Sequence, residues 1–231
     1  MRTKFQQGLD TLRERLLKMG GMAEQAVDRA CQAYRDRDLS LCQRVLDGET
    51  LINAAEREID EIGFDLLAMQ QPMAIDLRFI LAVIKINADL ERVGDQAVNI
   101  AERVMDMVDL PKADLPVDIP RMAAAVSAMV RRALESFIEG KAELAQAVLE
   151  MDNVVDRMKD EAFIVLVKSM NEHPETTRQA LDALLVARNL ERVADHATNI
   201  AEDVIFWVRG ADVRHNVAPE QPEQQEVTDT H

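Results

Sequence analysis

A stretch of 13 residues occurs twice in the chain and limits the possible folds to those built from a repeated unit. Residues 90–102 and residues 190–202 are identical at 10 of 13 positions, and the second copy begins 100 residues after the first. Similarity of this kind at one offset indicates an internal duplication.

Both copies have the period of an amphipathic helix, with an apolar stripe and a polar stripe almost opposite each other. The apolar stripe of the first copy is Leu90, Val93, Ala97, Ile100 and Val104, and it recurs 100 residues later. The polar stripe is Glu91, Asp95, Asn99 and Glu102, and it recurs as Glu191, Asp195, Asn199 and Glu202.

The composition favours helices throughout, because aromatic residues are only 3% of the chain and good helix formers dominate. Apolar residues at helical spacing predict helices at about 3–35, 39–70, 74–109, 120–138, 141–171 and 175–209. In the first of these, Gly20 and Gly21 interrupt the apolar period and predict a kink or weak point. In the second, the predicted core stripe is Leu51, Ala55, Ile59, Ile62 and Leu66.

Three prolines between residues 110 and 120 form the clearest boundary in the chain. The three helices on each side have short connections, which make antiparallel neighbours. We therefore expect an all-α fold of two tandem three-helix bundles related by internal duplication. The first repeat is predicted at 1–110 and the second at 119–210. Residues 211–231 have no apolar period, and we expect a disordered tail there.

The formal net charge of −15 argues against nucleic acid as a partner and favours cations or a basic protein surface. The first residues have no apolar core of a signal peptide, and the longest apolar run, residues 162–167, is far too short to span a membrane. Cys31 and Cys42 have no metal or disulfide pattern. A cytoplasmic protein without membrane insertion is the expectation.

The acidic stripes have two possible interpretations. Each of the three pairs Glu91 with Asp95, Glu191 with Asp195, and Asp152 with Asp156 is separated by one helical turn. Such carboxylates are typical of a solvated face, but oxygen ligands on one face also suit a metal cation, and both readings stay open. If the second and third helices of each repeat are neighbours, their stripes meet in one groove.

The remaining polar residues indicate no catalytic site. His196 replaces Gln96 of the first copy, and its position favours a surface or capping histidine over a ligand. Asn99 and Asn199 suit either an exposed helix or the orientation of a carboxylate. The sequence contains no nucleophile with a base, no phosphate-binding loop and no paired Cys/His set, so we expect no enzyme. A metal-dependent enzyme remains the less favoured alternative, beside a plain helical scaffold.

The two motif copies, the plan of two times three helices and the prolines after the second helix of each repeat resemble the PhoU family. The strongest resemblance lies in residues 90–102 and 190–202. It implies paired three-helix bundles, a homodimer, and a regulator of phosphate uptake and phosphate-starvation signalling. Such a protein couples a phosphate ABC transporter to a sensor histidine kinase and keeps the phosphate regulon off.

The resemblance also implies metal clusters of iron or zinc on the bundle surface, with magnesium and manganese open as alternatives. Carried over position by position, the metal ligands are Glu49, Glu91, Asp95, Asp152, Asp156, Glu191 and Asp195. Two positions depart from the pattern. Asn53 stands where the second repeat has Asp156, and Lys159 stands where the first repeat has Glu56.

Overall fold

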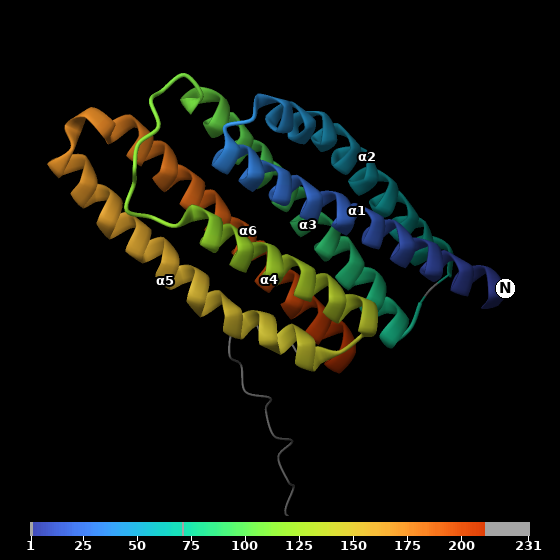
Figure 1. Cartoon of the computed structure of the whole chain (residues 1–231). Helices are drawn as coiled ribbons and strands as arrows, with labels where there is room; N and C mark the ends of the chain where they lie inside the picture. The colour runs from blue at the N-terminus through green and yellow to red at the C-terminus, as the bar shows by residue number, and fades with distance from the viewer. Residues whose placement is uncertain (1, 71, 211–231) are drawn as a thin grey trace, which may run out of the picture.

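The structure is a computed structural model that describes residues 2–70 and 72–210 (Figure 1). Its α-helices are α1 (Arg2–Asp36), α2 (Leu39–Gln70), α3 (Ile75–Met107), α4 (Ile119–Glu139), α5 (Ala142–Glu172) and α6 (Thr177–Arg209). A 3₁₀ helix, η1 (Pro174–Thr176), joins α5 to α6. The all-α prediction is confirmed, and the helix bounds agree with the expected ones to within two residues. The predicted tail, 211–231, lies outside the described residues.

The helices form two tandem three-helix bundles, as predicted. Helices α1, α2 and α3 pack together, as do α4, α5 and α6. The bundles meet mainly through α3 and α6, with a smaller contact between α1 and α4. Among the described elements, α2 contacts only α1 and α3, and α5 contacts only α4, α6 and η1. Four helices therefore form the centre, and α2 and α5 flank it (Figure 1).

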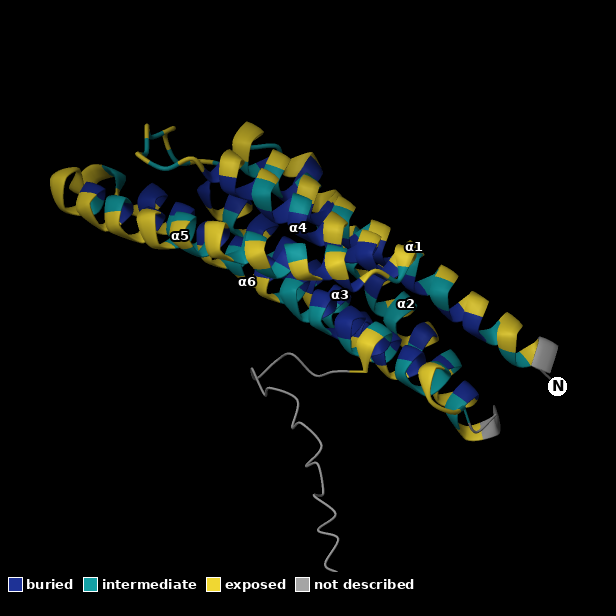
Figure 2. Ribbon diagram, turned by 90° about the horizontal axis from the view of Figure 1, so that it is seen from below, coloured by how far each residue is buried: buried dark blue, intermediate teal, exposed yellow. Residues whose placement is uncertain are grey.

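The predicted apolar stripes of α3 and α6 are buried in the centre. Leu90, Val93, Ala97, Ile100 and Val104, and their equivalents 100 residues later, have no exposed surface (Figure 2). The stripe predicted for α2 was partly wrong, because Leu51 is 62% exposed and the neighbouring Ile52 is buried. The buried residues of α2 include a series with a seven-residue period, namely Val45, Ile52, Ile59 and Leu66.

Helix α1 continues through Gly20 and Gly21, where the sequence predicted a kink or weak point. Gly20 lies at a close contact between helices. A Cβ atom there would lie 2.7 Å from Leu134 Cδ2 of α4, whereas a Cβ at Gly21 would meet nothing within 4 Å. Gly210 ends α6 in the left-handed conformation at φ 71°, and its N–H donates to the Phe206 carbonyl, as the sequence predicted for that stop.

Candidate functional site

A cluster of four carboxylates lies between α5 and α6 in the second repeat. Helix α5 supplies Asp152 and Asp156, and α6 supplies Glu191 and Asp195. The pKa of Asp152 is raised to about 6, first by burial and then by the negative charges of Asp156, Asp195 and Glu191. The pKa of Asp195 is also raised, first by desolvation and then by Glu191 and Asp156. The structure thus brings all four predicted residues together.

The first repeat has a matching cluster between α2 and α3. The pKa of Glu91 is raised by desolvation and then by the charges of Asp95, Glu56 and Glu49, while Arg92 opposes the shift. Three of these acids were predicted to lie together. Glu56 was missed as a member of the cluster, although it lies seven residues after Glu49, on the same face of α2.

The two clusters differ at the two positions where the repeats depart from each other. In the first repeat, the side-chain oxygen of Asn53 is buried and has no hydrogen-bond partner among the described residues. In the second repeat, Lys159 Nζ lies 3.4 Å from Glu191 Oε1 and 3.1 Å from Asp160 Oδ1. Lys159 therefore compensates part of the negative charge of the second cluster. In the first cluster, the neutral amide of Asn53 takes the place of one carboxylate.

The donor chemistry of both clusters suits a hard or borderline cation, because every predicted ligand supplies carboxylate oxygen. The arrangement of the side chains does not form a complete metal site. Among residues 2–70 and 72–210, no group of three or more His, Cys, Asp or Glu side chains is arranged so that it could hold a metal ion. The clusters are concentrations of negative charge, and they are not preformed chelating sites.

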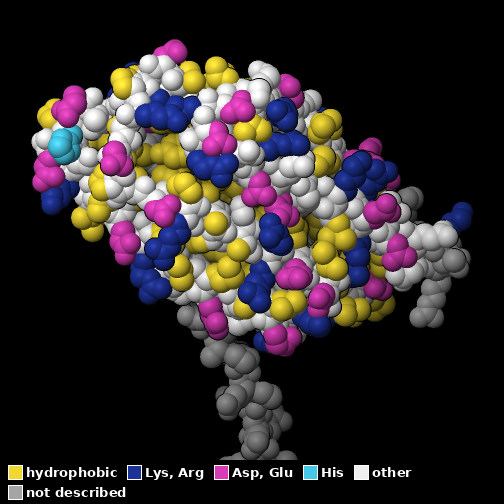
Figure 3. Space-filling model, viewed as in Figure 1, with side chains coloured by type: hydrophobic (Ala, Val, Ile, Leu, Met, Phe, Trp, Pro, Cys, Tyr) yellow, Lys and Arg dark blue, Asp and Glu magenta, His cyan; other side chains and the backbone are white. Residues whose placement is uncertain are grey.

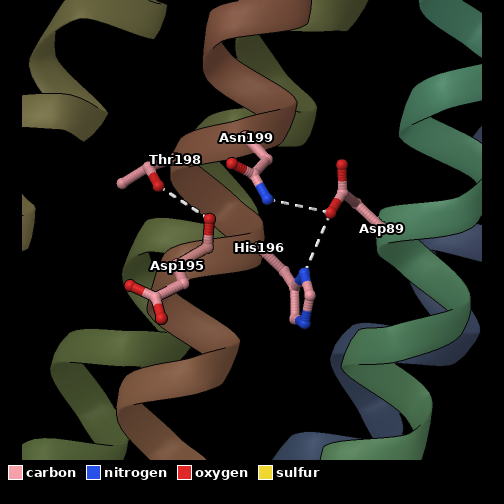
Figure 4. Close-up of polar contacts among 5 residues, drawn as sticks. All are labelled: Asp89, Asp195, His196, Thr198 and Asn199. Atoms are coloured by element: carbon pink, nitrogen blue, oxygen red, sulfur yellow. Dashed lines mark hydrogen bonds and ion pairs between the residues drawn. The ribbon is translucent and has the colours of Figure 1, made fainter. Parts of the chain in front are cut away.

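His196 and Asn199 point away from the carboxylate cluster and toward the other repeat (Figure 4). His196 Nδ1 lies 2.9 Å from Asp89 Oδ1, and Asn199 Nδ2 donates to the same oxygen at 3.1 Å. His196 is only 14% exposed, so the expected surface or capping role was wrong. The Asp195 carboxylate, by contrast, points away from Asp89. These residues join α6 to α3, and the sequence offered no sign of the Asp89 contact.

The face that carries α1 and α4 has acidic and basic side chains interspersed around apolar ones (Figure 3). A groove of about 540 Å³ lies between these two helices. Its charged side chains have polar partners. Ser127 Oγ donates to Asp28 Oδ1 at 2.7 Å, Arg131 Nη2 lies 2.8 Å from Glu24 Oε1, and Arg35 Nε lies 2.9 Å from Asp36 Oδ1. The groove therefore presents little unsatisfied charge to a ligand.

No helix in the described part of the chain is both long and apolar enough to cross a lipid bilayer.

Comparison with known proteins identifies the family. The model of the PhoU domain matches residues 16–104 and 119–204, one match in each repeat. A Pseudomonas aeruginosa protein named phosphate-specific transport system accessory protein PhoU homolog is 40% identical over 215 residues, which cover 92% of this chain and 88% of that protein. A protein of the same name from Rhizobium meliloti is 36% identical over 209 residues, covering 90% and 88%.

Solved structures have the same fold. The crystal structure of PhoU from Pseudomonas aeruginosa superposes with a TM-score of 0.86 at 38% identity, covering 90% of this chain and 100% of that one. The phosphate transport system regulatory protein PhoU from Streptococcus pneumoniae superposes with a TM-score of 0.81, and at 24% identity it supports the fold alone. This chain is a member of the PhoU family, because the domain model matches both repeats, relatives are up to 40% identical over nearly the whole chain, and the fold is the same.

Proposed function

We propose that the protein is a cytoplasmic, non-enzymatic regulator of phosphate uptake and phosphate-starvation signalling. It represses the phosphate regulon by coupling a phosphate ABC transporter to a sensor histidine kinase. The observation that carries the proposal is the 40% identity, over 92% of the chain, to a relative named as an accessory protein of phosphate-specific transport.

The architecture suits regulation through protein contacts. Helices α2 and α5 lie at the two outer sides of the central four helices, so each presents a long face to a partner (Figure 2). Each also borders a carboxylate cluster that attracts basic surfaces. Homodimer formation belongs to the same proposal, and sedimentation equilibrium on the full chain would measure it.

The regulatory role can be tested in a strain that lacks the chromosomal gene and carries a reporter under a phosphate-controlled promoter. We expect the deletion strain to express the reporter in high phosphate, and we expect a plasmid copy of the gene to restore repression. Normal repression in the deletion strain would contradict the proposal.

Metal binding is the second part of the proposal. Iron or zinc, or magnesium or manganese as alternatives, would bind the carboxylates of both clusters and neutralise their repulsion. The residues that would hold the metal are Glu49, Glu91 and Asp95 in the first repeat and Asp152, Asp156, Glu191 and Asp195 in the second. The excess of negative charge in each cluster supports this assignment.

Metal content by ICP-MS tests this part on protein purified without a chelator or an affinity tag. We expect stoichiometric metal in the wild type and its loss in the quadruple variant Glu91→Ala, Asp95→Ala, Glu191→Ala and Asp195→Ala. A matched control replaces four exposed acids outside the predicted ligand set, Glu61, Asp65, Glu135 and Glu150, and should keep the metal. Equal trace metal in all three proteins would leave the acids as a solvated face.

A further inference from the structure

An open groove with an apolar floor lies between α5 and α6 in the second repeat, near the end where the two helices connect. Its volume is about 360 Å³, and its lining combines three large apolar residues with two acidic and two basic ones. The apolar residues are Phe163, Leu184 and Leu185, and the charged ones are Lys159, Asp160, Arg188 and Glu191.

Phe163 and large apolar side chains close to the lining residues in sequence are exposed to solvent. Phe163 is 53% exposed, Ile164 66% and Val167 37%, and all three lie on α5 within about one helical turn of each other. Leu181 on α6 is 46% exposed. Grouped exposed apolar residues of this kind mark sites of protein interaction more often than single ones do.

The two repeats differ at the position of Phe163. Buried residues of α2 and α5 align at an offset of 103, for example Ile52 with Val155 and Ile59 with Ala162. By the same offset, Asp60 occupies the position of Phe163.

Asp60 belongs to a polar contact inside the first repeat. Asn87 Nδ2 donates to Asp60 Oδ1 at 3.0 Å and to the Glu56 carbonyl at 2.9 Å. Ala187 replaces this asparagine in the second repeat, 100 residues later. The second repeat therefore has an exposed phenylalanine where the first has a paired aspartate. The fold does not require an apolar side chain at this position.

Acidic residues lie beyond the apolar part of the groove, farther along α5 and α6. Asp156 and Asp152 precede Phe163 by seven and eleven residues on α5, a distance of roughly 10 to 16 Å along the helix axis. The ion pair between Lys159 and Glu191, at 3.4 Å, lies between the apolar part and these acids. The surface thus changes from apolar to acidic over two to three helical turns.

We propose that this surface, which we call the α5/α6 groove, binds an amphipathic helix of a partner protein. Apolar side chains of the partner would enter beside Phe163, Leu184 and Leu185. Lys or Arg residues two to three turns away would face Asp152, Asp156 and Asp195. The inference rests on the proposed function in that it names the surface through which a regulator acts by protein contact. A second copy of the chain is a poorer occupant, because it carries the same net charge of −15.

Fluorescence anisotropy with a defined peptide tests the groove directly. The probe is a labelled 20-residue helical peptide, with leucines on one face at one end and three lysines two to three turns away. A matched peptide has glutamates in place of the lysines. Titrations use the full chain with EDTA, so that a bridging metal plays no part. We expect the lysine peptide to bind at least tenfold more tightly than the glutamate peptide.

The deciding variant is Phe163→Ser, which changes an exposed side chain and should leave the fold intact, as circular dichroism would verify. We expect it to weaken binding of the lysine peptide at least tenfold. The control is Phe64→Ser, at an exposed phenylalanine of the first repeat that is 56% accessible, and it should bind like the wild type. Equal binding by Phe163→Ser and the wild type, or no binding of the lysine peptide to the wild type, would overturn the proposal.

The reporter strain separates this inference from the proposed function. If the wild-type gene does not restore repression, the regulatory role fails and the peptide titration alone decides on the groove. If the wild type represses and Phe163→Ser represses equally well, the groove is not the regulatory surface and the inference fails. Sedimentation provides a third outcome. If the wild type is a dimer and Phe163→Ser is a monomer, a second copy of the chain occupies the groove, and the proposal of a basic partner helix is contradicted.

Discussion

Asp152 shows at the residue level how far the carboxylate cluster is from an ordinary solvated surface. Its pKa is raised to about 6, well above the ordinary value of an aspartate, because burial and three neighbouring carboxylates disfavour its charged form. A raised carboxyl pKa means that the folded state binds the proton more tightly than the unfolded state. The contribution of Asp152 to the free energy of unfolding therefore decreases as the pH rises from about 4 to about 6, and the decrease is complete above that range.

We expect Asp152→Asn to stabilise the metal-free protein at pH 7 and to have little effect at pH 4. Because solvent screens a partly exposed group, the gain should be about 1 kcal/mol, well below the value that the full shift would give. Urea denaturation at both pH values with EDTA measures it. Glu150→Gln, at an exposed acid of the same helix, is the control and should change stability little at either pH. A gain of the same size at pH 4 and pH 7 would contradict the electrostatic origin.

Helix α1 shows at the level of the element why two adjacent glycines have different roles. Gly20 is buried against α4, and Leu134 Cδ2 would lie 2.7 Å from a Cβ atom at this position. Gly21 is exposed and has free space around it. The pair looks like a helix-breaking signal in sequence, but only Gly20 has a packing role, and Gly21 merely lowers the helix propensity.

We expect Gly21→Ala to raise the free energy of unfolding by up to about 1 kcal/mol, through helix propensity. Gly20→Ala has the same propensity gain but forces Leu134 to move within a packed contact. We therefore expect it to be less stable than Gly21→Ala by at least about 1 kcal/mol in urea denaturation. Equal stability of the two variants would show that α1 and α4 do not approach as closely as the structure indicates.

At the level of the whole molecule, three aromatic rings join the repeats at one end of the central four helices. Phe79 of α3 lies 5.2 Å from Trp207 of α6 between ring centroids, and Phe137 of α4 lies 5.5 Å from the same tryptophan. The guanidinium carbon of Arg13 lies 5.6 Å from the Trp207 ring centroid. Because Trp207 is the single tryptophan of the chain, its fluorescence reports on the contact between the repeats.

We expect the two repeats to unfold together, because the extensive contact between α3 and α6 couples them. Urea transitions followed by Trp207 fluorescence and by circular dichroism at 222 nm should have the same midpoint. Phe79→Leu, which reduces the aromatic contact, should lower both midpoints equally. A fluorescence transition that precedes the loss of helix would show instead that the repeats separate before they unfold.

Local periodicity is enough to predict the helices and the acidic face of each repeat, and the identity of residues 90–102 with 190–202 predicts the duplication. The helices and their faces are properties of single elements, and the 3.6-residue period makes them visible in the order of residues. The buried stripe Leu90, Val93 and Ala97 and the acids Glu91 and Asp95 could be assigned to opposite faces in this way. The repetition of the pattern 100 residues later made the assignment stronger than one helix allows.

Only the tertiary structure decides which faces meet, because that depends on how helices far apart in sequence pack together. It adds Glu56 to the first cluster, places Lys159 against Glu191 in the second, and brings His196 to Asp89 across the two repeats. It also leaves Phe163 exposed at a position where the equivalent Asp60 is paired with Asn87. A helical period cannot distinguish these outcomes, since it is the same for a face that packs against a neighbour and for one that stays open to a partner.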